Sequence, residues 1–346
     1  MTTTGSCLFR ADANTQIGTG HVMRCLALAQ AWQDAGGSVT FAMCDDNPVI
    51  EKRLKSENFS VSKIESKYGS AEDAYETIKI AQNINAEWIV VDGYHFGSAY
   101  QKIIKNAGLR LLFVDDNGHS DYYYADIVLN QNIHAQEEMY EKREAYTRLL
   151  LGTKYVLLRR EFLKWRKWKR EIPEVARKLL VTLGGGDPDN VTLKVIQSLQ
   201  QVKVEKLESI VVVGGNNPHF DQLHEAVRNS SIHIQLKRDV NNISELMAWA
   251  DMAVAAAGTT SWELCFFGLP SLLIILAENQ RFIAEYLNEI GAAKTLGRHY
   301  KLVVKTLTKS LISLLTKRKR RYKMCKREKK VMDGLGCHRV VECIGK

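Results

Sequence analysis

The chain of 346 residues is too long to fold around one ordinary hydrophobic core, and its length fits two α/β domains. With 45% hydrophobic and 25% charged residues it reads as globular, and its apolar runs fall far short of the ~20 residues that span a bilayer, which excludes disordered and membrane-spanning proteins. Residues 317–330 contain ten Lys or Arg and one acid and so account for the whole net charge of +9, which argues against a general affinity for nucleic acid.

The stretch from Arg10 to Arg24, RADANTQIGTGHVMR, follows an apolar run at residues 7–9 and leads into a helical pattern at residues 26–32. This order predicts a strand, a turn with Gly18, Gly20 and His21, and a helix. Glycines let the backbone approach a ligand closely, and the first N–H groups of a helix face anions. We therefore expect a ligand crevice with His21 at its mouth. The alternative is a tight turn in which His21 is a cap residue.

Apolar, β-rich runs recur through the first half at residues 38–44, 88–92, 110–116 and 127–130. Their spacing leaves room for helices and predicts a parallel sheet with helices on both faces. Ligands bind beyond the carboxyl ends of such strands, where this sequence has Asp12, Asp92, Tyr94, His95 and the run Asp115-Asp116-Asn117. The alternative for each Asp is an ordinary helix cap.

A second α/β series follows Pro173, with predicted strands at residues 178–183, 209–215, 232–236 and 252–256. Gly184 and Gly185 begin a Gly-Gly-Gly-Asp run that can bind a diphosphate through backbone N–H groups. A second helix start at residues 258–261, Gly-Thr-Thr-Ser, adds three hydroxyls. Glu263, one turn inside that helix, is placed to accept hydrogen bonds from a ribose diol.

Several motifs are missing from the sequence. It has no Gly-x-x-x-x-Gly-Lys-Ser/Thr loop and no Gly-x-Gly-x-x-Gly after the first strand, which disfavours ATP hydrolysis and a nicotinamide cofactor. We interpret Asp115-Asp116 as a strand-end pair and not as a metal site, so we expect no metal and no cofactor. The seven scattered cysteines without Cys-x-x-Cys, and the lack of a leader pattern, indicate reduced thiols in a cytoplasm.

These patterns predict an N-terminal domain at residues 1–155, a linker helix at 156–176 and a C-terminal domain at 177–346 that ends in a basic helix. In the linker we expect Phe162, Trp165 and Trp168 to pack inward. The basic run Lys317–Lys330 is interpreted as a solvated helix face, with weak contact to a membrane surface as the alternative.

Seven segments, taken in order, resemble the UDP-2,4-diacetamido-2,4,6-trideoxy-β-L-altropyranose hydrolases of pseudaminic acid biosynthesis, which are related to the two-domain GT-B glycosyltransferases. The segments are Gln16–Arg24, Asp92–Tyr94, Val114–Asp116, Tyr155–Phe162, Leu183–Asp187, Gly258–Glu263 and Ala277–Gln280. The resemblance implies a GT-B-like α/β fold, with two Rossmann-like doubly wound domains facing across a cleft. It also implies a hydrolase that removes UDP from a UDP-diacetamido-trideoxyhexose.

The resemblance implies that His21 activates the attacking water and that Tyr94 and Asn279 lie near the same site. It implies UDP binding by the second domain, and with the glycine turn the expected substrate-binding residues are Gly18, Gly20, Gly184, Gly185, Gly258, Thr259, Thr260, Ser261, Glu263 and Gln280. We expect metal-independent attack of water at the anomeric carbon, with inversion.

Two other functions fit the same motifs. One is a GT-B glycosyltransferase that passes the sugar of a UDP-amino sugar to an acceptor, and the other is a catalytically silent nucleotide-sugar-binding protein. Release of UDP in the absence of an acceptor distinguishes the hydrolase from both.

Overall fold

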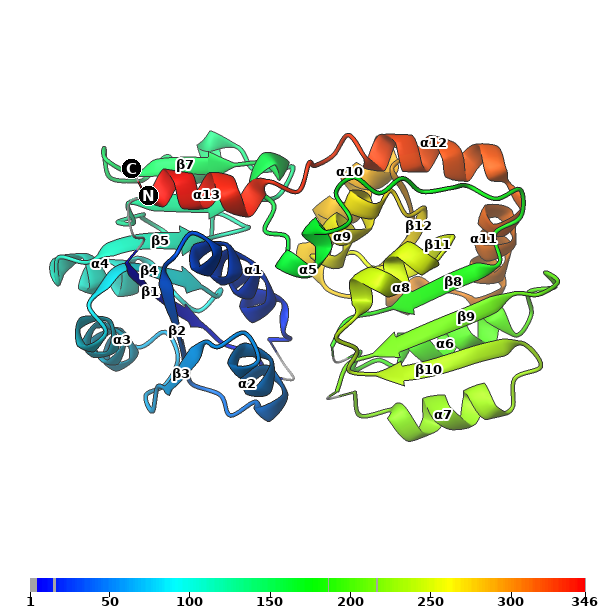
Figure 1. Ribbon diagram of the computed structural model, residues 1–346, viewed down its shortest axis with the longest axis horizontal. Helices are drawn as coiled ribbons and strands as arrows, with labels where there is room; N and C mark the ends of the chain where they lie inside the picture. The colour runs from blue at the N-terminus through cyan, green and yellow to red at the C-terminus, as the bar shows by residue number, and fades with distance from the viewer. Residues whose placement is uncertain (1–4, 15–16, 186, 216, 346) are drawn as a thin grey trace. The chain divides into compact units, whose positions relative to one another are not determined.

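The computed structural model describes residues 5–14, 17–185, 187–215 and 217–345, and the chain forms two compact units (Figure 1). The first unit comprises the residues up to Leu163 together with those from Gly334 onward, and the second comprises Lys164–Asp333. Each unit contains one parallel sheet with helices between its strands, so the predicted α/β class is confirmed.

The sheet of the first unit has seven parallel strands in the order β3-β2-β1-β4-β5-β6-β7. The central strand β1 pairs with β2 on one side and β4 on the other, so that Phe9 lies between Phe41 and Val90. Such strands are buried on both faces, which explains their nearly continuous apolar sequences. Their bounds are β1 (Ser6–Ala11), β2 (Ser38–Met43), β3 (Ser60–Lys63), β4 (Ala86–Asp92), β5 (Arg110–Val114), β6 (Ile127–Asn130) and β7 (Arg148–Leu151).

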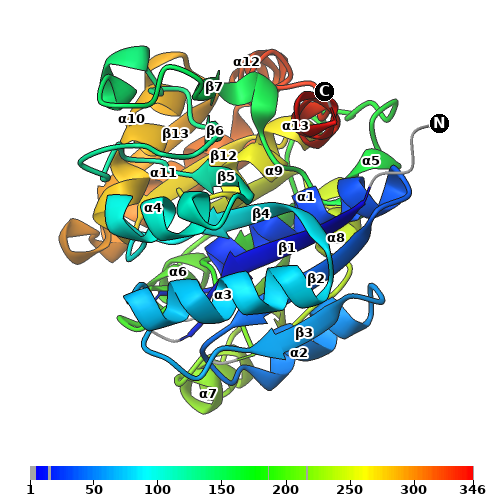
Figure 2. The ribbon, with the colours of Figure 1, turned by 90° about the vertical axis from the view of Figure 1, so that its left-hand side faces the viewer.

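Helices cover both faces of this sheet because successive side chains of β1 point to opposite sides. Cys7 and Phe9 belong to a core shared with α1 (Gly20–Asp34), α2 (Pro48–Lys55) and α13 (Gly336–Ile344). Leu8 belongs to a core shared with α3 (Ala71–Asn83) and α4 (Ser98–Asn106), and α3 lies in front of the strands in Figure 2. Short helical turns complete the unit: η1 (Glu137–Tyr140), η2 (Thr153–Tyr155) and α5 (Arg160–Leu163).

The last helix, α13, belongs to the first unit, although the C-terminal domain was expected to extend to residue 346. Val340 and Ile344 are buried in the core beside α1. A Cβ atom on Gly336 would stand 2.1 Å from the carbonyl oxygen of Val156, so glycine is required for this close approach. The chain therefore returns to its first unit after completing the second.

The expected linker helix at residues 156–176 is reduced to the four residues of α5, followed by turns and irregular chain. Phe162 is fully buried in the first unit. Trp165 and Trp168 are half-buried in the second unit, each with its ring 5.8 Å from that of Phe267.

The sheet of the second unit has six parallel strands in the order β10-β9-β8-β11-β12-β13. The strands are β8 (Lys178–Thr182), β9 (Glu208–Val213), β10 (His233–Arg238), β11 (Met252–Ala256), β12 (Ser271–Ile275) and β13 (Ala293–Arg298). Around them lie α6 (Val191–Leu199), α7 (Phe220–Arg228), α8 (Ile243–Trp249), α9 (Thr260–Phe267), η3 (Glu278–Gln280), α10 (Arg281–Glu289), η4 (His299–Lys301), α11 (Val304–Thr316) and α12 (Arg318–Glu328).

The apolar side chains of the second unit form a core between its sheet, α6 and α11, which includes Leu179, Val195 and Leu311. No helix of the described residues is both long and apolar enough to cross a membrane. All seven cysteines are free thiols.

Candidate active site

The strand order predicts one ligand-binding crevice in each unit. In open parallel sheets, ligands bind beyond the carboxyl ends of the two strands at which the strand order reverses. That point lies between β1 and β4 in the first unit and between β8 and β11 in the second. The glycine turn with His21 follows β1, Gly184 and Gly185 follow β8, and Gly258 follows β11.

The glycine turn leaves open space beside the start of α1. Gly18 has φ +77°, a left-handed conformation that favours glycine, and Gly20 is the first residue of α1. Among the described residues outside its own turn and helix, no atom lies within 4 Å of a Cβ built on either glycine. Thr19, at the N-cap, makes no side-chain hydrogen bond to the helix, and the first turn contains no acidic residue. A ligand can therefore approach this backbone closely.

His21 is held by a buried carboxylate. Its Nδ1 lies 2.7 Å from Oδ1 of Asp92, the last residue of β4, and the two residues are 8% and 0% exposed. Burial alone would raise the pKa of Asp92, but the Arg24 guanidinium and His21 outweigh it and hold the pKa well below its usual range. Because a carboxylate only accepts hydrogen bonds, this contact favours a proton on Nδ1, although Nη2 of Arg24 also lies 3.1 Å from that nitrogen.

Arg24 completes this arrangement from one turn further along α1. Its Nε and Nη2 donate to the two oxygens of Asp92 at 2.5 and 2.6 Å, and its Nη1 donates to Asp116. Sequence reasoning had placed both aspartates at strand ends but had not assigned Arg24 to the site. The spacing of three residues from His21, which puts both side chains on one face of the helix, was the available signal.

Tyr94 lies against His21, with the edge of one ring toward the face of the other and 4.8 Å between ring centres. Its hydroxyl is 3.4 Å from Oδ2 of Asp116, and Asn132 donates to the other oxygen of Asp116 at 2.6 Å. Tyr94 is 39% exposed, so this side of the crevice is accessible to a ligand. Asn132 was not among the residues suggested by the sequence.

Asp115 has a structural task. Its oxygens accept the backbone N–H groups of Asn117, Gly118 and His119 and the hydroxyl of Tyr123. The expected alternative for a strand-end Asp was a helix cap, whereas Asp115 caps N–H groups of the loop that follows β5. The described residues contain no group of three or more His, Cys, Asp and Glu side chains that could hold a metal ion.

In the second unit, the glycine-rich loop after β8 contains a carboxylate that caps the helix that follows it. Asp187 is buried, and its carboxylate accepts the N–H groups of Val191 and Thr192 at 2.8 Å each, at the start of α6. Gly184 adopts φ +91°, while Gly186 lies outside the described residues. The N-terminus of α6, expected to help bind a diphosphate, is therefore already occupied by a carboxylate.

The N-terminus of α9 differs from that of α6 in its first N–H groups, because those of Ser261 and Trp262 bond to the carbonyl oxygens of Gly258 and Thr259 and not to a carboxylate. Thr259, at the N-cap, makes no side-chain hydrogen bond to the helix. The buried hydroxyl of Ser261 has no hydrogen-bond partner among the described residues. Glu263 is half-buried in the first turn. Gln280 closes the neighbouring loop by accepting the N–H of Leu276 at 3.0 Å, and its amide nitrogen is 3.7 Å from a Cβ built on Gly258.

The structure thus gathers the expected residues into two groups. Gly18, Gly20, His21 and Tyr94 lie together in the first unit. In the second unit, Gln280 lies beside the Gly258 loop, Gly185 packs against Gly214, and Asn279 is exposed on η3.

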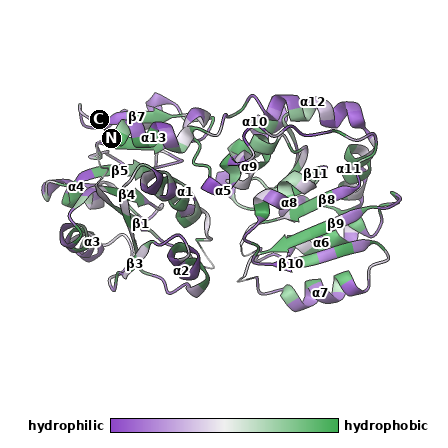
Figure 3. Cartoon of the chain, viewed as in Figure 1, coloured by the Kyte–Doolittle hydropathy of each residue, from purple (hydrophilic) through white to green (hydrophobic). Residues whose placement is uncertain are grey.

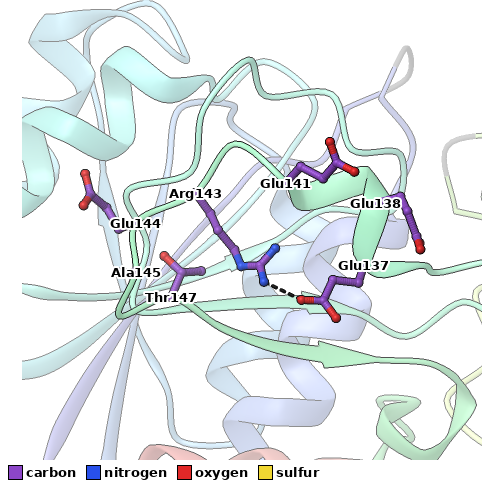
Figure 4. A pocket seen from close by; sticks show the side chains of 7 residues that line it. All are labelled: Glu137, Glu138, Glu141, Arg143, Glu144, Ala145 and Thr147. Carbon is purple, nitrogen blue, oxygen red and sulfur yellow. Dashed lines mark hydrogen bonds and ion pairs between the residues drawn. The ribbon is translucent and has the colours of Figure 1, made fainter.

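An acidic depression of about 520 Å³ lies elsewhere in the first unit, around η1 (Figure 4). Four glutamates line it with Arg143, which pairs with Glu137. It contains none of the expected site residues, and its negative charge does not suit a nucleotide.

Comparison with known proteins agrees with the motifs. Residues 179–335 match the C-terminal domain of glycosyltransferase family 28. The chain is 27% identical over 286 residues to the UDP-2,4-diacetamido-2,4,6-trideoxy-β-L-altropyranose hydrolase of Campylobacter jejuni, which covers 82% of this chain and 96% of that protein. It is 29% identical over 288 residues to an uncharacterized protein of Methanocaldococcus jannaschii, MJ1062, covering 81% of this chain and 58% of that longer relative. The resemblance to the hydrolases is confirmed.

Among solved structures, MurG of Acinetobacter baumannii superposes with a TM-score of 0.67 at 16% identity, covering 99% of both chains. At this identity the likeness shows the fold alone. The chain has the GT-B fold of glycosyltransferases.

The Gly20→Ala substitution tests whether a ligand approaches the start of α1. The methyl group fits the free protein, so the melting temperature should stay unchanged. We expect turnover of a UDP-sugar to fall about ten- to a hundredfold, because overpacking of a close contact costs about 1–3 kcal/mol. Gly97→Ala is the matched control, since Gly97 is the N-cap of α4 and has equally open surroundings. Equal turnover in both variants would show that the substrate lies elsewhere.

Proposed function

We propose that the protein hydrolyses a UDP-2,4-diacetamido-2,4,6-trideoxyhexose in pseudaminic acid biosynthesis, releasing UDP and the free sugar. The match to the Campylobacter jejuni hydrolase along almost its entire length supports this substrate class. The observation that carries the proposed chemistry is the 2.7 Å contact between His21 Nδ1 and the buried Asp92 carboxylate. In this proposal the contact holds the imidazole in the form that accepts a proton at Nε2.

His21 acts as the general base in this proposal. Nε2 takes a proton from water while the water oxygen bonds to the anomeric carbon, and the C–O bond to UDP breaks with its electron pair on the phosphate oxygen. The positive charge gained by the imidazole is balanced by Asp92, which the two donors of Arg24 keep ionised. General-base catalysis of this kind contributes about 10²–10⁴-fold to a rate.

The second unit binds the nucleotide in this proposal. The N-terminus of α9 offers a positive dipole end and the hydroxyl groups of Thr259, Thr260 and Ser261, which suit a diphosphate. Glu263, one turn further, accepts the hydroxyl groups of the ribose. Stabilisation of the diphosphate makes UDP an adequate leaving group, and a single displacement by water inverts the anomeric configuration.

We predict that His21→Ala abolishes sugar release, with turnover at least about 10²-fold lower, while UDP affinity stays within a few-fold of wild type. The reason is that His21 supplies proton transfer and the second unit supplies nucleotide affinity. Turnover is measured by UDP release, and affinity by calorimetry. Near-normal turnover in a folded variant would remove His21 from the mechanism.

Glu263→Ala should weaken UDP binding about ten- to a hundredfold, because hydrogen bonds to a charged group contribute about 1.5–3 kcal/mol. Glu245→Ala is the matched control, since Glu245 also lies in the first turn of a helix, α8, in the same unit. Calorimetry with UDP compares the two variants. Unchanged affinity in Glu263→Ala would mean that the ribose does not bind at α9.

The bond that breaks distinguishes this proposal from its rivals. In ¹⁸O-water without any acceptor, we expect UDP to be released intact, the label to enter the anomeric hydroxyl, and the first sugar product to have inverted configuration. The reaction should survive a chelator, because the proposed base and anion-binding helix do not depend on a metal ion. UMP and a sugar phosphate as products would indicate attack at phosphorus. UDP release only with an added acceptor would indicate a glycosyltransferase, and no release a binding protein.

A further inference from the structure

Helix α12 is held firmly along one face. Arg321 is fully buried and donates through Nη1 to the carbonyl oxygens of Leu314 and Leu315 at the end of α11, both at 2.6 Å. Met324 reaches the core of the second unit, and Glu328 is fully buried. These three positions recur at helical spacing, so the inner face fixes the helix against the unit.

The opposite face of α12 and the residues just after it are almost purely cationic. Six exposed residues share this basic face, Lys319, Tyr322, Lys323, Lys326, Arg327 and Lys330, and at 3.6 residues per turn they fall within about 140°. Glu328, the one acid of the run, points inward. The structure thereby separates charges that are mixed along the sequence, and five cations remain on one surface.

The charge of these five cations is not compensated within the part of the chain that the structure describes. Among the described residues none of them lies within ion-pairing distance of a carboxylate, whereas Arg318, at the margin of the basic face, is 3.8 Å from Glu174. Lys326 instead stands 4.7 Å from the centre of the Tyr322 ring. In Figure 3, α12 is coloured mainly as hydrophilic.

We propose that the basic face of α12 docks the protein on a membrane surface that carries anionic lipids. Clustered Lys and Arg are attracted to a negative lipid surface, and an exposed Tyr side chain suits the headgroup region. Tyr322 is 48% exposed, and the basic face has no exposed Leu, Ile, Phe or Trp, so the contact is peripheral and electrostatic.

A nucleic acid fits this face less well. Its cations are four lysines and a single arginine, whereas Arg provides the bidentate phosphate contacts common in nucleic-acid recognition. Single-strand binding also stacks successive bases on several aromatic rings, and the basic face has one.

The experiment is co-sedimentation of the full chain with vesicles of phosphatidylcholine, with and without phosphatidylglycerol. We expect binding only to the anionic vesicles and release in about 1 M salt, where the screening length falls to about 3 Å. Neutralising Lys319, Lys323 and Lys326 together, each to Gln, should weaken binding roughly a hundredfold, at about fivefold per charge. Sugar release in solution and the melting temperature should not change.

The matched control replaces Lys52, Lys79 and Lys102 with Gln, which removes the same charge from exposed positions on three other helices. This variant should bind the vesicles like wild type. Equal weakening in both triple variants would overturn the proposal, because it would show a response to net charge alone. Absence of vesicle binding, or tighter binding to an RNA oligonucleotide that depends on the same three lysines, would overturn it as well.

Discussion

The crevice of the first unit depends on the buried guanidinium of Arg24, which joins the carboxylates at the ends of β4 and β5. Burying charges costs more than their attraction usually returns, so such a cluster is a poor source of stability. Its effect here is on geometry and ionisation. Without Arg24, the buried carboxylate of Asp92 would lose its main stabilising charge and take up a proton more readily. A protonated Asp92 could no longer act only as an acceptor, and the proton on Nδ1 of His21 would lose its fixed place. The proposed base therefore depends on a residue that need not touch the substrate.

The same logic recurs on the neighbouring side of β1. Arg10 is fully buried and pairs with Asp12 at 2.8 Å and with Asp73 at 2.8 Å, while His95 Nε2 lies 3.2 Å from Asp12. Burial would raise the pKa of Asp12, but the contacts of His95 and Arg10 lower it to about 2. Both clusters lie where β1 and β4 end, so the polar groups of this edge are fixed by ion pairs before any ligand arrives. The polar residues at the strand ends therefore fall into two groups. Asp92 and Asp116 lie in the candidate site with His21, whereas Asp12 and His95 belong to the neighbouring ion-pair cluster of Arg10.

The sequence predicts the centre of each sheet better than its edges. Strands β1, β4, β8 and β11 are buried on both faces, and their sequences are therefore recognisable as apolar runs. Three of the four edge strands, β3, β7 and β13, are short or polar, and periodicity did not reveal them. In the second unit the edge strand β10 was predicted, whereas the buried interior strand β12 was not. The return of α13 to the first unit was also hidden, because its contacts with α1 join residues about 300 positions apart and leave no local signal. Within the site, the glycine turn and His21 follow from local patterns. The ion pairs of Arg24 require the sheet register that brings Asp92 and Asp116 side by side.

The two glycine-rich loops of the second unit show why a motif needs its surroundings. In sequence both precede a predicted helix, and both were expected to help bind a diphosphate. The Asp at its end is the decisive residue, because its carboxylate folds back onto the first N–H groups of α6 and satisfies them internally. The Gly-Thr-Thr-Ser run has hydroxyl groups in place of that acid, and none of them caps α9. A hydroxyl can donate to a phosphate oxygen, whereas a carboxylate would repel it, and for this reason the proposed function has the diphosphate bind at α9. The loop after β8 then contributes through its glycine backbone, where Gly184 adopts a left-handed conformation that few other residues tolerate.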